Sequence, residues 1–137
     1  MSISDTAQTF FDLCEAGKGA DACAPYCTDG ASFSCQADAL AEVTTVAAYA
    51  DWMQGLGSAV PDMRPEVKFW GVDQEHNSVS AFAVFHGTQT GEGGPVPPTG
   101  NTVAADYVYV MEFEGDKISH MTKIWNDGHS LKQLGWA

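Results

Sequence analysis

One acid stands alone in an apolar stretch, where its chemistry depends on which way it faces. Asp106 is the single acid of residues 103–108, VAADYV. A carboxyl group in an apolar cavity has a raised pKa, so an inward-facing Asp106 is predicted to be a base that removes a proton beside a carbonyl group. An outward-facing Asp106 is expected to be solvated or paired with Lys123. Alternation along a strand leaves both possibilities open.

Two histidines and two tyrosines are the other side chains suited to proton transfer or ligand orientation. His86 and His120 lie in alternating runs, where each can carry a proton near neutral pH or serve only as a hydrogen-bonded histidine. Tyr107 and Tyr109 share one strand face with Met111 and Phe113, as cavity lining or as ordinary core. Buried phenols need hydrogen-bond partners, so Tyr109 is the preferred group to orient a ligand oxygen.

Helical patterns fill the first half of the chain. Apolar residues at three-to-four spacing predict an amphipathic helix from a cap near Asp5 to just before Gly17. A short helix is expected from about Asp21, and a longer one over residues 42–56. His129, after an Asn-Asp-Gly turn, is expected to open a terminal helix rather than to act in catalysis.

Strand patterns fill the second half. A brief strand is expected near Phe33, and period-two alternation begins at Glu66 and recurs to about Asn126. Both faces of the runs at residues 79–86 and 103–113 are apolar, so both are expected to be covered. The predicted fold class is α+β, with helices packed over a curved antiparallel sheet in a single domain, residues 1–137.

Charge and composition limit the classes of partner and ligand that the chain is expected to bind. The net charge is -12, which repels nucleic acid and anionic membranes, so neither is expected as a partner. The first residues lack a signal-peptide pattern and no run reaches the length of a membrane span, which predicts a cytoplasmic location. Four cysteines without matching zinc-finger spacing are expected to be reduced thiols, and the sequence calls for no metal or cofactor.

A stretch rich in glycine and proline, residues 87–100 (GTQTGEGGPVPPTG), separates two of the predicted strands. No helix or basic residue follows it closely, so it is not a phosphate-binding loop. Neighbouring strands and the Pro97-Pro98 pair favour an ordered connection over a disordered linker. We call residues 87–100 the lip.

The lip and four other segments carry a family resemblance. Residues 87–92, 97–100, 114–118, 59–64 and 133–135 (GTQTGE, PPTG, EGDKI, AVPDMR and QLG) resemble the SnoaL-like polyketide cyclase branch of the nuclear transport factor 2-like superfamily. The resemblance implies a cone in which helices close over a strongly bent sheet around a mostly apolar pocket. It also implies a homodimer formed through the outer sheet face.

The resemblance implies site residues as well. The cyclase-type members use a His before the lip and an Asp on the following strand as an acid/base pair, and Gln89 stands at the His position here. Gln89 forms hydrogen bonds but takes no proton near neutral pH. When this strand is aligned with that of the family, the position of the family's acid falls nearer to Tyr109 than to Asp106. Phe33, Trp52, Met53 and Trp125 match pocket-wall positions of the family, and the same residues can equally be simple packing. Asn126 stands where relatives often carry an acid.

Three functions remain open. The leading hypothesis is a small SnoaL-like enzyme that moves protons on an apolar, carbonyl-bearing molecule, with Asp106 as the base and Gln89, Tyr109 or His86 as orienting groups. The alternative is a non-catalytic protein that binds an apolar ligand in the same pocket, and a further one is an epoxide hydrolase-like enzyme. The proposed ligand contacts are Phe33, Trp52, Met53, Tyr107, His120, Trp125 and Asn126.

Overall fold

Four α-helices and five strands form the domain, which a computed structural model describes over all 137 residues. The first helix starts earlier than predicted, because Ser2 and Asp5 form a reciprocal capping box. Thr45 caps the third helix, which therefore starts after the predicted residue 42. The helices are α1 (Ile3–Glu15), α2 (Ala20–Cys23), α3 (Val46–Ala59) and α4 (Asp127–Leu134).

The five strands make one sheet in the order β1-β5-β4-β3-β2. Tight turns join β2 to β3 and β4 to β5, which makes these neighbours antiparallel. The pair β1 and β5 is parallel, a correction to the predicted all-antiparallel sheet. The strands are β1 (Cys27–Cys35), β2 (Arg64–Asp73), β3 (Ser78–Thr88), β4 (Thr102–Glu114) and β5 (Lys117–Trp125).

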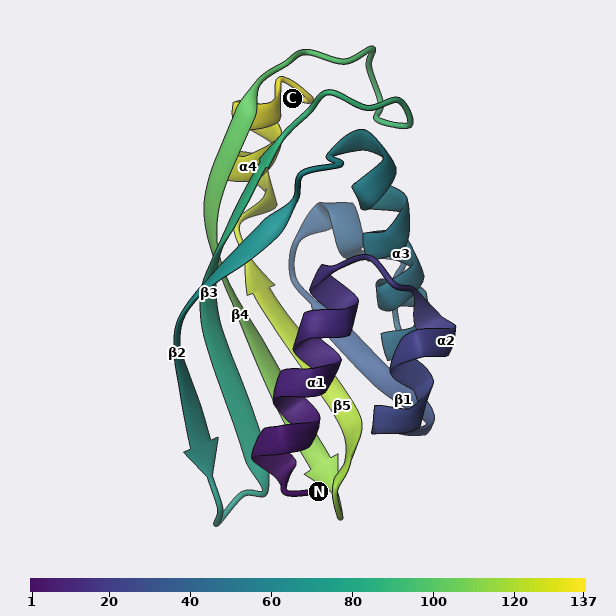
Figure 1. Ribbon diagram of the computed structural model, residues 1–137, viewed down its shortest axis with the longest axis vertical. Helices are drawn as coiled ribbons and strands as arrows, with labels where there is room; N and C mark the ends of the chain where they lie inside the picture. The colour runs from purple at the N-terminus through teal and green to yellow at the C-terminus, as the bar shows by residue number, and fades with distance from the viewer.

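The sheet bends around the helices, as Figure 1 shows, so that α1 and α3 lie on its inner face and α4 lies by the end where β4 begins. Inner and outer residues alternate along β4: Ala105, Tyr107 and Tyr109 are buried, whereas Asp106 is exposed. Helices over a strongly curved sheet confirm the predicted α+β cone. No helix is long and apolar enough to cross a membrane.

The lip is an ordered connection held at both ends. The side chain of Gln89 bridges it, because its amide donates to the Gly91 carbonyl and its oxygen accepts from the Thr99 amide at 2.6 Å. Gly91 lies so close to the Ser58 carbonyl at the end of α3 that a Cβ atom has no room there. The hydroxyl of Thr99 donates to Leu134 in α4. The lip therefore fastens α3 and α4 to each other over one end of the cone.

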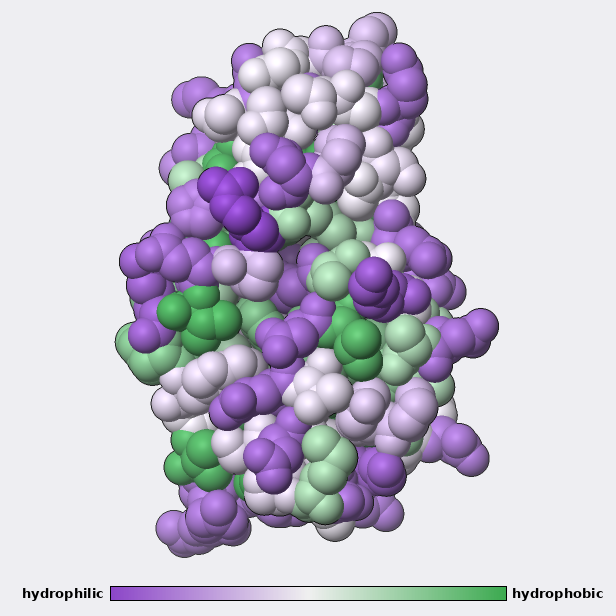
Figure 2. All heavy atoms as spheres, viewed as in Figure 1, coloured by the Kyte–Doolittle hydropathy of each residue, from purple (hydrophilic) through white to green (hydrophobic).

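An apolar row crosses the outer face of the sheet. Phe69, Phe82, Val108 and Ile124 face one another in register on four successive strands. Phe69 is 63% exposed and Ile124 is 59% exposed, so the chain itself does not cover the ends of this row. The face in Figure 2 differs, because hydrophilic residues dominate it and hydrophobic ones form small separate areas.

Candidate functional site

An apolar cavity lies inside the wide end of the cone, between α3, α4 and the inner face of the sheet. Its free volume is about 40 Å³, the space of about three water molecules. Twelve residues line it, ten of them hydrophobic, and none is an acid. They are Trp52, Met53, Leu56, Phe85, Val103, Tyr107, Lys123, Trp125, Ser130, Leu131, Leu134 and Trp136.

A second hollow lies outside this cavity, beneath the lip. It has a volume of about 330 Å³ and is lined by Gly93, Gly94 and Pro95 of the lip. Trp52, Leu56 and Trp136 line both spaces, so these three side chains form the partition between them. The indole N–H of Trp136 is buried without an acceptor.

Lys123 is the one charged side chain in the cavity wall. It lies on β5 between Met121 and Trp125, and the residue is only 6% exposed. Its amine lies 4.5 Å from the ring centre of Trp125 and 5.0 Å from that of Tyr49, with Trp52 and Tyr107 also within 5.6 Å. Such contacts stabilise a cation. No carboxylate lies within ion-pair distance of it.

A chain of hydrogen bonds leads from this amine into the core. Lys123 Nζ donates to Tyr49 Oη at 2.9 Å, Tyr49 Oη lies 2.8 Å from Tyr109 Oη, and Tyr109 Oη donates to Glu15 Oε2 at 2.6 Å. Tyr107 donates to the other carboxyl oxygen. A phenol has one hydrogen, and that of Tyr109 goes to Glu15. The hydroxyl of Tyr49 therefore donates to Tyr109, and every hydrogen in the chain points toward the carboxyl group.

Burial pushes both ends of this chain toward their uncharged forms. Loss of water raises the pKa of Glu15, while the charge of Lys123 and the hydrogen bonds from Tyr107 and Tyr109 lower it in part. Loss of water lowers the pKa of Lys123, and the charge of Glu15 raises it in part. The pKa values of Tyr49, Tyr107 and Tyr109 are raised, with burial as the first cause. Burial therefore disfavours the charge at each end, and each charge favours the other across the two phenols.

Sequence analysis missed both ends of the chain, although the signals were present. Glu15 follows Ala7 and Phe11 at intervals of four, which places a carboxyl group on the apolar stripe of α1. Lys123 alternates with Met121 and Trp125, the latter a predicted pocket residue, so period two already placed the lysine on the inner face. In both cases a charged residue occupies an apolar pattern.

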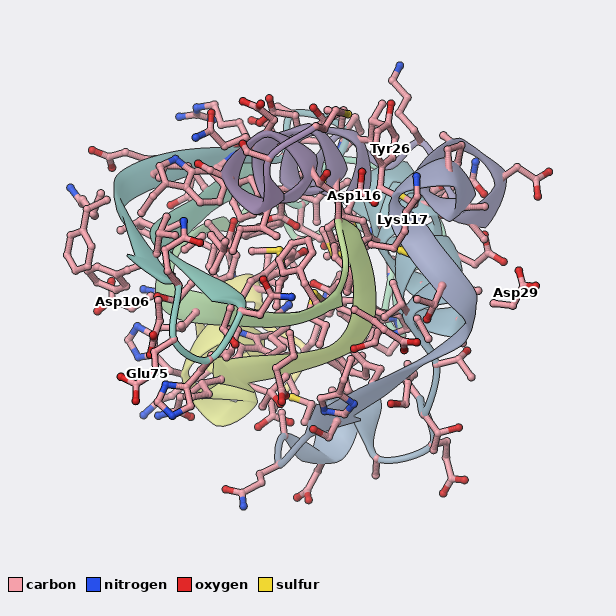
Figure 3. All side chains as sticks on the ribbon, turned by 90° about the horizontal axis from the view of Figure 1, so that it is seen from below. Tyr26, Asp29, Glu75, Asp106, Asp116 and Lys117 are labelled. Atoms are coloured by element: carbon pink, nitrogen blue, oxygen red, sulfur yellow. The ribbon has the colours of Figure 1, made fainter.

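Asp106 does not lie in the cavity. It is exposed on the outer face of β4, opposite Val84 of β3, and Figure 3 shows it at the periphery of the molecule. The prediction of a catalytic base required an inward-facing Asp106, and the structure places this residue on the opposite face. It does not pair with Lys123 either, because the two side chains lie on opposite faces of the sheet.

His86 and Gln89 also lie away from the cavity. His86 is on the outer face of β3, where Nε2 is 2.9 Å from Glu66 Oε1. Gln89 is completely buried, but both ends of its amide bind the backbone of the lip. Gln89 therefore holds the two ends of the lip together and does not face the cavity.

His120 and Asn126 are two further departures from the predicted ligand contacts. His120 lies on the outer face between β1 and β5, 2.6 Å from the Ser32 hydroxyl and 3.0 Å from that of Ser34. Asn126 caps α4 by accepting from the His129 amide. The terminal helix was expected to open at His129 and begins two residues earlier, at Asp127. Neither His120 nor Asn126 lines the cavity.

The predicted aromatic residues do gather at the site. Trp52, Met53, Tyr107 and Trp125 line the cavity. Trp125 is oriented by its indole N–H, which donates to Ser130 at 2.8 Å. Phe33 lies one layer deeper, stacked on Tyr49 at 4.6 Å between ring centres. Tyr109 is buried behind the wall, in the middle of the hydrogen-bond chain.

Metal ligation and disulfide bonding are not features of this site. No group of three or more His, Cys, Asp or Glu side chains is placed to hold a metal ion. The four cysteines are free thiols, and Cys27 is the first residue of β1.

Comparison with known proteins gives a family match over most of the chain. The sequence pattern of a family described as "SnoaL-like domain" matches residues 7–121. This range includes Glu15, Tyr49, Tyr107 and Tyr109 and stops two residues before Lys123. The comparison with curated proteins found no match.

Solved structures share the fold at low sequence identity. IdmH from Streptomyces antibioticus, provisionally assigned as a polyketide cyclase, is 22% identical with a TM-score of 0.76, and the match covers 98% of this chain and 99% of that one. AclR from Streptomyces galilaeus, provisionally assigned as a hydroxylase, is 19% identical with a TM-score of 0.75 over 99% and 88%. A cystatin-fold protein from Novosphingobium aromaticivorans is 22% identical with a TM-score of 0.64 over 90% and 98%.

Proposed function

Because the chain belongs to the SnoaL-like domain family, we propose that its cavity takes a small apolar carbonyl compound and that Lys123 transfers protons to and from it. One observation carries this proposal. A buried amine, hydrogen-bonded to a single phenol, lines an otherwise apolar cavity. Burial lowers the pKa of this amine, so it gives up its proton more readily than an exposed lysine does.

The hydrogen-bond chain prepares Lys123 for this role. When the proton of the pair resides on Glu15, the amine is neutral and can remove a proton from the carbon beside the carbonyl group. The ammonium that forms then attracts the enolate oxygen, and the surrounding rings stabilise it. Return of the proton to another atom of the ligand gives an isomerisation, and attack of the enolate carbon on a second carbonyl group gives a ring closure.

The test measures exchange of hydrogen for deuterium beside the carbonyl group of cyclopentanone, cyclohexanone and 2-tetralone in deuterated buffer, by NMR. The wild-type protein is expected to accelerate exchange and Lys123→Met to abolish the acceleration. Glu15→Gln is expected to shift the acid limb of the pH profile to lower pH, because the carboxylate charge raises the pKa of Lys123. Equal exchange in Lys123→Met and the wild type would contradict the proposal.

A non-catalytic binding protein is the second candidate. The small volume of the cavity and the absence of an acid from its wall favour it, since catalysis by Lys123 requires the reacting carbon to reach the amine. A thermal-shift screen with the same ketones separates the two, because a bound ligand raises the melting temperature with or without exchange. An epoxide hydrolase role lacks support, because no carboxyl group faces the cavity to activate water.

A further inference from the structure

We infer that Lys123 is a nucleophile that condenses with small apolar aldehydes and ketones to form an imine, which makes the cavity a covalent carbonyl-capture site. This inference rests on the proposed function, since it uses the same cavity. It goes further because a base leaves the ligand unattached, whereas an imine joins it to the chain through a carbon–nitrogen bond.

Access and nucleophilicity set Lys123 apart from the other four lysines. Lys18, Lys68, Lys117 and Lys132 are exposed, and none of them lines the cavity. Lys123 is buried, has one phenol as its hydrogen-bond partner, and lines the cavity. The neutral amine is the nucleophile in imine formation, and burial favours that form.

The hydrogen-bond chain also supplies the protons that condensation requires. The nitrogen lone pair attacks the carbonyl carbon, and one amine proton moves to the oxygen, which gives a carbinolamine. Tyr49, 2.9 Å from the nitrogen, then delivers a proton to this hydroxyl group, and it is replenished from Glu15 through Tyr109. The carbon–oxygen bond breaks, water leaves, and the iminium keeps the last amine proton. Nothing is oxidised or reduced, and the neutral pair becomes a carboxylate and an iminium cation.

The surroundings favour the product. Four aromatic rings lie within 5.6 Å of the nitrogen and stabilise its positive charge. The ionisable groups that influence Lys123 are Glu15 and Cys14 of α1 and Cys35 of β1, together with the phenols of α3 and β4. Glu15, the strongest of them, lies behind two phenols and not against the amine, so it offsets the charge without blocking the approach of a carbonyl group.

The experiment is trapping with sodium cyanoborohydride, which reduces an imine to a stable secondary amine. The full-length protein is incubated with cyclohexanone or cyclopentanone at pH 7, and the product is analysed by intact mass and peptide mapping. One label per chain is expected, on Lys123, with a mass gain equal to that of the ketone less one oxygen atom. Lys18→Met is the matched control and should label like the wild type.

Two variants sharpen the result. Lys123→Met should lose the label, and Tyr49→Phe, which keeps the ring but removes the proton donor, should label at least tenfold more slowly. Peptide mapping of the wild type locates the label even if Lys123→Met fails to fold. A label spread over the exposed lysines, or none on Lys123 at a saturating ketone concentration, would overturn the inference.

Deuterium exchange, measured on the same samples, separates this inference from the proposed function. Exchange without a label on Lys123 means that the amine acts only as a base, which contradicts the inference and leaves the proposed function standing. A label without exchange supports covalent capture and contradicts proton transfer. Absence of both contradicts both.

Discussion

Charged side chains on the two faces of the sheet lie in opposite environments, exposed on one face and buried on the other. On the outer face of β4, Asp106 is exposed to water beside an apolar row that ends in Phe69 and Ile124. On the inner face, one residue further, Tyr107 begins a buried network that joins Glu15 to Lys123. A conspicuous acid in an apolar sequence is thus ordinary surface, whereas the buried acid and base come from two segments more than a hundred residues apart.

This comparison shows at which positions a change of charge should alter the stability of the fold. An exposed carboxylate stays hydrated, so its replacement changes the free energy of unfolding only slightly. A buried acid and base exchange water for a few hydrogen-bond partners, and removal of either one leaves the other less well compensated. The following substitutions test this difference between the faces, from the largest expected effect to the smallest.

Replacement of Lys123 by Met should have the largest effect on stability. Without the amine, only the hydrogen bonds from Tyr107 and Tyr109 offset the burial that raises the pKa of Glu15. Stability is then fully present below the unfolded-state pKa of about 4.3 and is lost as the pH rises through the raised folded-state value. Urea denaturation should show a loss of about 3–5 kcal/mol at pH 8 and a smaller loss at pH 5. The same loss at both pH values would show that packing, not charge, is responsible.

Replacement of Tyr109 by Phe removes the middle of the hydrogen-bond chain while the ring remains. Glu15 loses a donor and Tyr49 loses its acceptor, which should cost about 1–3 kcal/mol. Urea denaturation measures this cost. Phe113→Leu, on the same inner face but outside the chain, is the comparison for ordinary packing. A double substitution with Glu15→Gln should cost less than the sum of the single ones, and strict additivity would contradict a connected chain.

The outer row provides a prediction about assembly. We propose that a second copy of the chain covers this face, because its four apolar side chains lie in register and the two at the ends, Phe69 and Ile124, are exposed to water. Sedimentation equilibrium should detect a dimer, and Ile124→Glu should weaken it at least tenfold, about 1.4 kcal/mol. Glu114→Gln, at an exposed position near the end of β4, is the control. A wild-type monomer at high concentration would refute this assignment.

Replacement of Asp106 by Asn should have the smallest effect. The side chain is exposed and outside the cavity, so the free energy of unfolding should change by less than about 0.5 kcal/mol. Deuterium exchange and labelling of Lys123 should match the wild type. Loss of exchange in this variant would return Asp106 to the active site and disprove the assignment of the two faces.

Local sequence determined much of the fold. Three-to-four spacing of Ala7, Phe10, Phe11 and Cys14 defined α1, and period-two alternation defined β3 and β4, because these patterns follow from the geometry of single elements. Family resemblance added the cone and three of the residues that line its cavity, Trp52, Met53 and Trp125. Element ends were less certain, since the caps at Ser2 and Thr45 depend on individual side-chain hydrogen bonds.

Only the tertiary structure decided the site. Alternation shows that Asp106 and Tyr107 lie on opposite faces of β4, but not which face the helices cover. Packing of α1 on the sheet brings Glu15 to Tyr109, and the third helix brings Tyr49 between Tyr109 and Lys123. The chemistry of each residue was fixed by its type, whereas its pKa and its partners depend on burial, which only the assembled fold creates.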